Sequence, residues 1–260
     1  METMRYQENR KSYKGIIIGF FLFVIVGGAL IYLGIKEEGE PTVIGGNVKD
    51  EINSLVDTEK VNSNIEVASL VVNVTDKIIK DSENKKLIGN MTLPQISIAS
   101  EELKEINDEI YNNYYERFSN LKSSMEKAEN KFNFNVSYEN YDNVQSGRRI
   151  LSIVVRQEIV DASSKKKTNE NVTTYNIDVA KKEAVKLNEI LLLYYGADYK
   201  TIAKNKIKDY LVSNKMIKED EFTYAITGLE NFYIKDSKVH MIFNSEEIVN
   251  SKYGIIDITI

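Results

Sequence analysis

The sequence of 260 residues contains no cysteine, no tryptophan and a single histidine. Without cysteine, the chain can form no disulfide, thiolate nucleophile, cysteine-ligated zinc site or iron–sulfur cluster. His240 alone leaves too few imidazoles for a catalytic triad or a multi-histidine metal site. The motifs G-x-x-x-x-G-K, G-x-G-x-x-G and G-x-S-x-G are also missing from the sequence. We therefore predict a protein that is not an enzyme and that holds no cofactor or metal.

Carboxylates are the candidate acid/base groups of this chain, which has 39 Asp and Glu residues. The adjacent pairs Glu101–Glu102 and Glu246–Glu247 do not mark a site, since neighbours on a strand or a helix point away from each other. An acid/base pair of the glycosidase kind depends on tertiary structure. A carboxylate-dependent enzyme acting on peptidoglycan therefore stays an alternative.

One long uncharged stretch is present, the 21 residues from Gly15 to Ile35. At ~1.5 Å per residue, a helix of this length crosses the ~30 Å hydrocarbon core of a bilayer. The stretch has no polar face, which favours a membrane span over a buried core helix. Its length and the lack of a small-x-small site favour an uncleaved anchor over a signal peptide. We predict a transmembrane helix over residues 15–35, with Gly15 and Gly19 spaced for a weak homodimer.

Charges on either side of this stretch predict its orientation. Residues 1–14 carry four Lys/Arg and two Asp/Glu, which places the N-terminus in the cytoplasm. Subtracting these from the totals of 34 basic and 39 acidic residues leaves 30 and 37, a net charge of −7 for the rest of the chain. This acidic part is expected outside the cell membrane. Its charge argues against a nucleic-acid partner and fits a cationic protein.

After a tether over residues 36–63, we predict two α+β subdomains, over residues 64–162 and 163–260. Ser100 is a good N-cap for a long helix. The helix is indicated by apolar residues at steps of three or four. These are Leu103, Ile106, Ile110, Tyr114, Phe118, Leu121, Met125 and Ala128. His240 alternates with Val239 and Met241, so we expect it on the face of its strand away from the core.

The remaining elements follow from alternation, β-branched runs and turn residues. Strands are predicted over residues 65–74, 86–98, 132–138, 150–160, 172–179, 231–235, 238–243 and 255–260, a turn over 142–149, a polar loop over 163–171 and helices from 187 to 194 and after Asp198. Pro94 suggests an edge or a bulge in its strand, Gly196 ends the first of these helices, and Asp236–Ser237 forms a hairpin turn. The predicted fold class is α+β: an N-terminal transmembrane helix followed by a mainly antiparallel sheet packed against a long helix and a second helical segment.

The last thirty residues contain an aromatic strand, a short turn, a hydrophobic strand ending in Phe-Asn and a final strand. This pattern resembles a bacterial extracytoplasmic domain of unknown function found in RsiV-like anti-sigma factors, which bind lysozyme, and in PdaC-type peptidoglycan deacetylases. The segments from Leu93 to Phe118 and from Thr174 to Leu192 also match, so the resemblance covers about residues 65–260. The residues that carry it are Phe232, Tyr233, Phe243, Asn244, Gly254 and Ile258, and their implied role is structural.

The resemblance implies a membrane-anchored domain that faces the cell wall and binds lysozyme or another wall-active protein. Three departures shape this expectation. Family members often have proline and tyrosine after Phe-Asn, where this chain has Ser245, Glu246 and Glu247. Anti-sigma members use a longer cytoplasmic segment than residues 1–14, and deacetylase members carry a histidine-rich catalytic domain. We therefore expect a binding or sensing domain, with a reduced anti-sigma signalling protein as an alternative.

Overall fold

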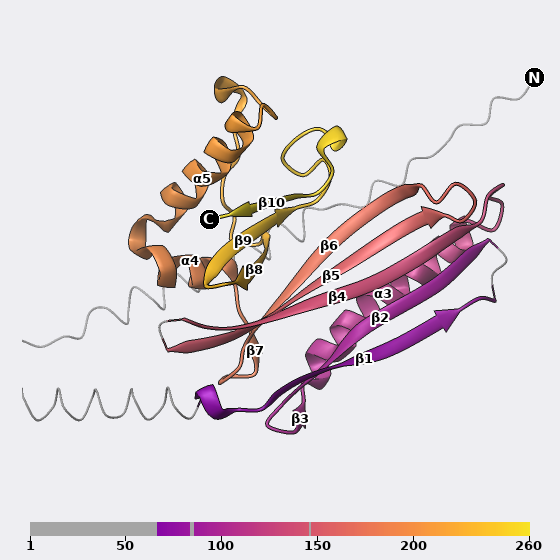
Figure 1. Cartoon of the computed structure of the whole chain (residues 1–260), viewed down its shortest axis with the longest axis horizontal. Coiled ribbons are helices and arrows are strands. Elements are labelled where there is room, and N and C mark those ends of the chain that lie inside the picture. Colours follow the sequence, from indigo (N-terminus) through magenta and orange to yellow (C-terminus); the bar gives the residue numbers. More distant parts are fainter. Residues whose placement is uncertain (1–66, 84–85, 146) are drawn as a thin grey trace, which may run out of the picture. The chain divides into compact units, whose positions relative to one another are not determined.

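The computed structural model describes residues 67–83, 86–145 and 147–260. Seven strands within these residues form the larger sheet, in the order β1-β2-β4-β5-β6-β7, with β3 paired to β2 (Figure 1). The strands are β1 Val72–Asp81, β2 Leu87–Ile98, β3 Glu101–Glu102, β4 Phe132–Gln145, β5 Arg148–Asp161, β6 Lys167–Asp178 and β7 Glu183–Ala184. The pairs are antiparallel except for β2 and β4, which run parallel.

Helix α3, Lys104–Ser124, allows this parallel pair because it returns the chain from the end of β2 to the start of β4. It lies against the sheet beside β2 and β4 (Figure 1). Ile110, Tyr114 and Phe118 are buried at four-residue spacing and form the larger core with the sheet. Gly89 of β2 leaves room for the Phe118 ring, since a Cβ there would lie 2.9 Å from the ring. The predicted long helix is confirmed, and the predicted apolar stripe is confirmed from Ile106 to Leu121, whereas Leu103, Met125 and Ala128 lie outside the helix.

A second sheet, in the order β10-β9-β8, comes from the C-terminal residues. Its strands are β8 Asn231–Lys235, β9 Lys238–Phe243 and β10 Ile256–Thr259, and it packs with helices α4 Leu187–Tyr195 and α5 Tyr199–Ser213. Buried residues of both helices and all three strands share the second core, among them Ile190, Ile207, Ile234 and Ile258. The predicted hairpin is confirmed: Asp236 and Ser237 both have positive φ, as a two-residue hairpin turn requires.

Side-chain amides join the smaller sheet to the outer edge of β6. Asn244, just after β9, donates from Nδ2 to the Val172 carbonyl at 3.0 Å and accepts from the Val172 N–H at 2.7 Å. The Asn231 Oδ1 accepts from the Thr174 N–H at 3.1 Å. These contacts occupy backbone groups that an added strand would otherwise use. The smaller sheet also contacts the inner strands of the larger one: the Ile234 N–H donates to the Ser152 hydroxyl of β5 at 3.0 Å, and Asn143 of β4 donates from Nδ2 to the Ile234 carbonyl at 2.7 Å.

The predicted fold class is wrong in its architecture. Among the described residues, no helix is long and apolar enough to cross a membrane, and the segment predicted to do so, residues 15–35, lies outside them. The sheet predicted as mainly antiparallel is mixed, because β2 and β4 run parallel, and the C-terminal strands form a separate three-stranded sheet that was not predicted. The chain from residue 67 onwards thus forms an α+β fold of a mixed sheet and several helices.

The other N-terminal predictions also fall outside the described residues. These are the cytoplasmic segment 1–14, the tether 36–63 and the pair Gly15 and Gly19. The boundary predicted between residues 162 and 163 falls in the turn between β5 and β6. The division into subdomains stays a prediction.

Several element boundaries differ from the prediction. Ser100 does not cap the long helix, because it lies in a tight turn with φ of 66° and the helix begins at Lys104. Strands β4 and β5 continue through the predicted turn over 142–149 and pair as far as Gln145 and Arg148. Strand β6 begins inside the predicted polar loop over 163–171. The prediction missed these extensions because the residues there are polar. They become strand only through pairing with residues that are distant in the sequence.

Pro94 lies where β2 lacks a strand on one side, between the residues that pair with β4 and those that pair with β3. The predicted edge position of this proline is thus confirmed. Asn107 of α3 fills the same gap: its Oδ1 accepts from the Ile96 N–H at 2.9 Å and its Nδ2 donates to the Ile96 carbonyl at 3.1 Å. The end of α4 at Gly196, which has φ of 68°, is also confirmed.

Candidate functional site

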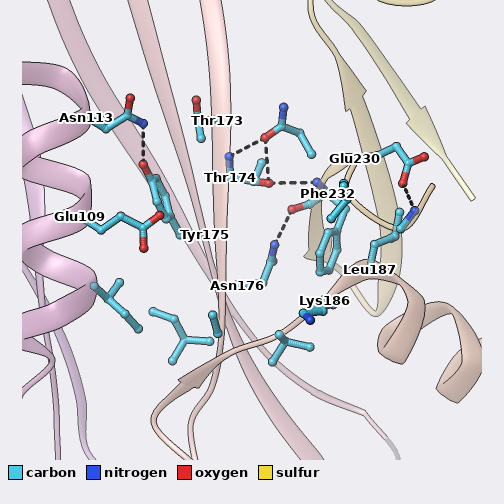
Figure 2. Close-up of a pocket in the computed structure, with 17 residues that line it drawn as sticks. Glu109, Asn113, Thr173, Thr174, Tyr175, Asn176, Lys186, Leu187, Glu230 and Phe232 are labelled. Atoms are coloured by element: carbon cyan, nitrogen blue, oxygen red, sulfur yellow. Dashed lines mark hydrogen bonds between the residues drawn. The ribbon is translucent and has the colours of Figure 1, made fainter. Parts of the chain in front are cut away.

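A cleft of about 290 Å³ lies between helix α3, strand β6 and the segments that precede α4 and β8 (Figure 2). We call it the β6 cleft. Its lining residues are Ile106, Glu109 and Asn113 of α3, residues 173–177 of β6, residues 184–187, and residues 228–232. Four segments that are distant in the sequence thus supply hydroxyl, amide, carboxylate and apolar groups to one concave surface.

The polar groups on the β6 wall are held in place by hydrogen bonds. Asn113 donates from Nδ2 to the Tyr175 hydroxyl at 2.9 Å (Figure 2). The Thr174 hydroxyl accepts from the Phe232 N–H at 2.9 Å, and the Asn176 Nδ2 donates to the Phe232 carbonyl at 2.7 Å. Burial raises the pKa of Tyr175, which therefore stays neutral at physiological pH. This wall offers a fixed, uncharged hydrogen-bonding surface.

Glu230 organises the turn on the opposite wall. One carboxylate oxygen accepts from the Thr227 N–H at 2.6 Å and from the Tyr224 hydroxyl at 2.7 Å, and the other accepts from the Gly228 N–H at 2.8 Å. Burial raises the pKa of Glu230, but these hydrogen bonds outweigh burial and hold the pKa below its usual value. Glu230 is therefore ionised at neutral pH, with both oxygens engaged in structure.

Glu109 is the other acid of the β6 cleft. Its side chain points from α3 towards Tyr175 (Figure 2). The Glu109 carboxylate thus lies beside the uncharged β6 wall, an arrangement that suits a cationic or hydrogen-bonding ligand. An acid/base pair would need a second carboxylate free to exchange protons, whereas Glu230 is tied to the turn. The arrangement is suited to binding.

His240 belongs to a separate polar cluster on the smaller sheet. Its Nδ1 lies 3.1 Å from one Asp257 oxygen, and the Tyr233 hydroxyl donates to the other at 2.6 Å. The Tyr233 ring stacks on the His240 ring at 4.7 Å and on the Tyr141 ring at 5.3 Å. Val239 is fully buried and His240 is partly exposed, so the predicted placement of the histidine away from the core is confirmed.

The residues that carry the family resemblance do not gather in one site. Phe232, Phe243 and Ile258 lie in the second core, and of the six only Phe232 also lines the β6 cleft. Tyr233 joins the His240 cluster, Asn244 holds Val172, and Gly254 takes a φ of +66° in the loop before β10. Each position has a packing or backbone role in the fold.

Sequence reasoning missed most residues of the β6 cleft. Glu109, Asn113 and Glu230 have no local motif, and Tyr175 was expected only as part of the strand over residues 172–179. One usable signal existed: Thr227 and Gly228, two and three residues before Glu230, are typical of a turn closed by a side chain. Among the described residues, no three His, Asp or Glu side chains lie where they could share a metal ion.

No protein-family model matches the chain, and no curated protein matches it. Solved structures similar to it include two DUF3298 proteins. One is a DUF3298 family member from Bacteroides fragilis, 14% identical, with a TM-score of 0.43 over 74% of this chain and 90% of that chain. The other is a DUF3298 family protein from Pseudomonas aeruginosa, 9% identical, with a TM-score of 0.45 and the same coverage.

These structural neighbours are domains of unknown function, as is the family that the C-terminal residues resemble. Neither is described as an anti-sigma factor or as a deacetylase. At this level of similarity, the function of this chain has to be argued from its own residues.

Proposed function

We propose that this protein is a non-catalytic binding domain on the outer face of the cell membrane, and that it captures a cationic, wall-active protein such as lysozyme. The observation that carries the proposal is the hydrogen bonding of the polar groups in the β6 cleft. Both oxygens of Glu230 accept hydrogen bonds from the turn, and the polar groups opposite are held by bonds of their own. Such a surface can hold a ligand by charge and hydrogen bonds without supplying a proton-transfer group.

The charge and order of the sequence support the rest of the proposal. The uncharged stretch from Gly15 to Ile35 follows a basic N-terminus, as expected for an anchor with a cytoplasmic start. The part after residue 14 has a net charge of −7, which attracts a basic partner at low ionic strength. The resemblance to the lysozyme-binding family points to lysozyme as the first partner to test.

Binding of the purified full chain to lysozyme tests the proposal directly. We expect a dissociation constant in the micromolar range or tighter, and weaker binding as salt rises, because exposed charges are screened within ~8 Å at physiological ionic strength. Isothermal titration calorimetry at low and high salt measures both. Failure to bind at tens of micromolar would remove lysozyme as the partner.

Two further measurements test the other parts of the proposal. A C-terminal tag on intact bacterial cells should be accessible to added protease, and protection of the tag would contradict the external location. Incubation of the full chain with peptidoglycan should release no fragments. Release that disappears in Glu109→Gln would establish the carboxylate-enzyme alternative instead.

A further inference from the structure

The turn at residues 227–230 holds one apolar side chain out in solvent. Leu229 is 86% exposed, the most exposed of the large apolar side chains in the described part of the chain, whereas the neighbouring Glu230 is only 8% exposed. The Glu230 carboxylate fixes the N–H groups of Thr227 and Gly228, and the Leu229 N–H donates to the Thr227 hydroxyl at 3.2 Å. We call residues 227–230 the Leu229 turn.

The backbone of the Leu229 turn is thus ordered before any partner arrives. Gly228 has φ of +87°, a conformation in which residues with a side chain are strained, and it lies against Asn188 of α4. An apolar group on a preformed turn loses little conformational freedom when it is buried in an interface. Scattered exposed leucines are common on protein surfaces. Leu229 differs because a buried carboxylate and its hydrogen bonds keep it exposed.

The charge beside the Leu229 turn indicates the kind of partner. The β6 cleft, which Leu229 lines, shares Ile106, Glu109 and Ala184 with a second cleft of about 480 Å³ at the start of α3. We call this second one the α3 cleft. Five glutamates and two lysines line it: Glu101, Glu102, Glu105, Glu109, Glu183, Lys104 and Lys182. The ion pair between Lys182 and Glu101 uses one lysine, so the walls retain an excess of negative charge.

We propose that the Leu229 turn and the two clefts form one docking surface for a cationic segment of a protein partner. Leu229 enters an apolar pocket of the partner, and lysine or arginine side chains of the partner lie along the acidic walls. A glycan would instead call for exposed aromatic faces, whereas Phe232 in the β6 cleft is only 4% exposed and Tyr175 is partly buried against the larger core. This inference rests on the proposed function and adds the surface through which it operates.

Substitution of the anchor provides the first test, with lysozyme as the probe and the full chain as the receptor. Leu229→Ser should weaken binding at least tenfold, because a buried interface anchor carries a large share of the affinity. Val144→Ser is the matched control, since Val144 is also an exposed apolar side chain, at 56%, and lies on β4 away from the clefts. The control should bind within twofold of the wild type. Thermal denaturation confirms that both variants are folded.

Substitution of the acidic wall provides the second test. The double variant Glu105→Gln/Glu183→Gln should bind more weakly and with a smaller dependence on salt, because fewer charge contacts form. The control, Glu126→Gln/Glu129→Gln, removes two exposed acids just beyond the other end of α3 and leaves the clefts intact. Equal losses in the two double variants would show that net charge alone attracts the partner and would overturn the acidic walls as its contact.

The outcomes separate the two proposals. A wild-type chain that does not bind lysozyme refutes the proposed capture of lysozyme and this surface with it. A wild-type chain that binds, together with a Leu229→Ser variant that binds equally well, refutes the docking surface and leaves the proposed function standing. Loss of binding in Leu229→Ser and in the wall variant, with both controls unchanged, supports the surface.

Discussion

The Asn244 side chain and the Val172 backbone form a closed pair of hydrogen bonds, of 3.0 and 2.7 Å, at the outer edge of strand β6. The Asn244 amide thus supplies the hydrogen-bond donor and acceptor that a neighbouring strand would supply to this edge. Asn107 does the same for Ile96 at the gap in β2. In both places a side chain covers backbone groups that would otherwise be left open to a competing strand.

Replacement of Asn244 by alanine should therefore destabilise the domain. The Val172 N–H and carbonyl would lose both partners at a partly buried site, at a cost of about 1–3 kcal/mol. Urea denaturation measures the change in the free energy of unfolding. Asn140→Ala, at an exposed position on β4, is the control and should shift stability by less than about 0.5 kcal/mol. Equal effects of the two substitutions would contradict the role assigned to Asn244.

The ionised Glu230 should make the stability of the domain depend on pH. Its folded-state pKa lies below the unfolded value of ~4.3, so its contribution is complete above that value and is lost as the pH falls through the folded pKa. Glu230→Gln removes the charge and should cost about 1–3 kcal/mol at pH 7, because hydrogen bonds to charged groups are the stronger ones.

Unfolding of the wild type and of Glu230→Gln, followed by circular dichroism from acidic to neutral pH, provides the measurement. The difference in stability between them should be full at neutral pH and should shrink in acid. A difference that stayed constant across this range would show that the charge of Glu230 is not what holds the Leu229 turn.

Gly89 should tolerate no larger residue while Phe118 is in place. A Cβ at Gly89 would lie 2.9 Å from the ring of Phe118, which is 1% exposed and has little room to move. Gly89→Ala should destabilise the larger core by about 1–3 kcal/mol through overpacking. In a double-mutant cycle, Phe118→Leu should reduce the cost of Gly89→Ala, since the smaller side chain leaves space. Additive effects would argue against this contact.

Much of the secondary structure was accessible from the sequence because its signals are local. The apolar stripe of α3 predicted Ile110, Tyr114 and Phe118 as its buried face, and alternation predicted the burial of Val239 and the exposure of His240. The hairpin at Asp236–Ser237 follows from turn chemistry. The ends of β4, β5 and β6 were missed because polar residues there become strand through pairing with distant partners.

Almost none of the candidate site could be predicted from the sequence. Glu109, Tyr175 and Glu230 belong to three separate segments, and no motif relates their spacings. Their approach depends on how α3 crosses the larger sheet and how the smaller sheet is held at β6. The pKa of Glu230 likewise depends on hydrogen bonds that exist only in the folded turn.

By itself, the sequence determined the composition of this protein: no thiol, one imidazole, an excess of acid and one uncharged N-terminal stretch. It also determined the periodic patterns that become helices and strands, because those patterns depend on neighbours a few residues apart. Only the tertiary structure decided that the sheet is mixed, that a second sheet packs against β4, β5 and β6, and that acids from separate segments face one cleft. Those features depend on contacts between residues far apart in the chain, which no local pattern encodes.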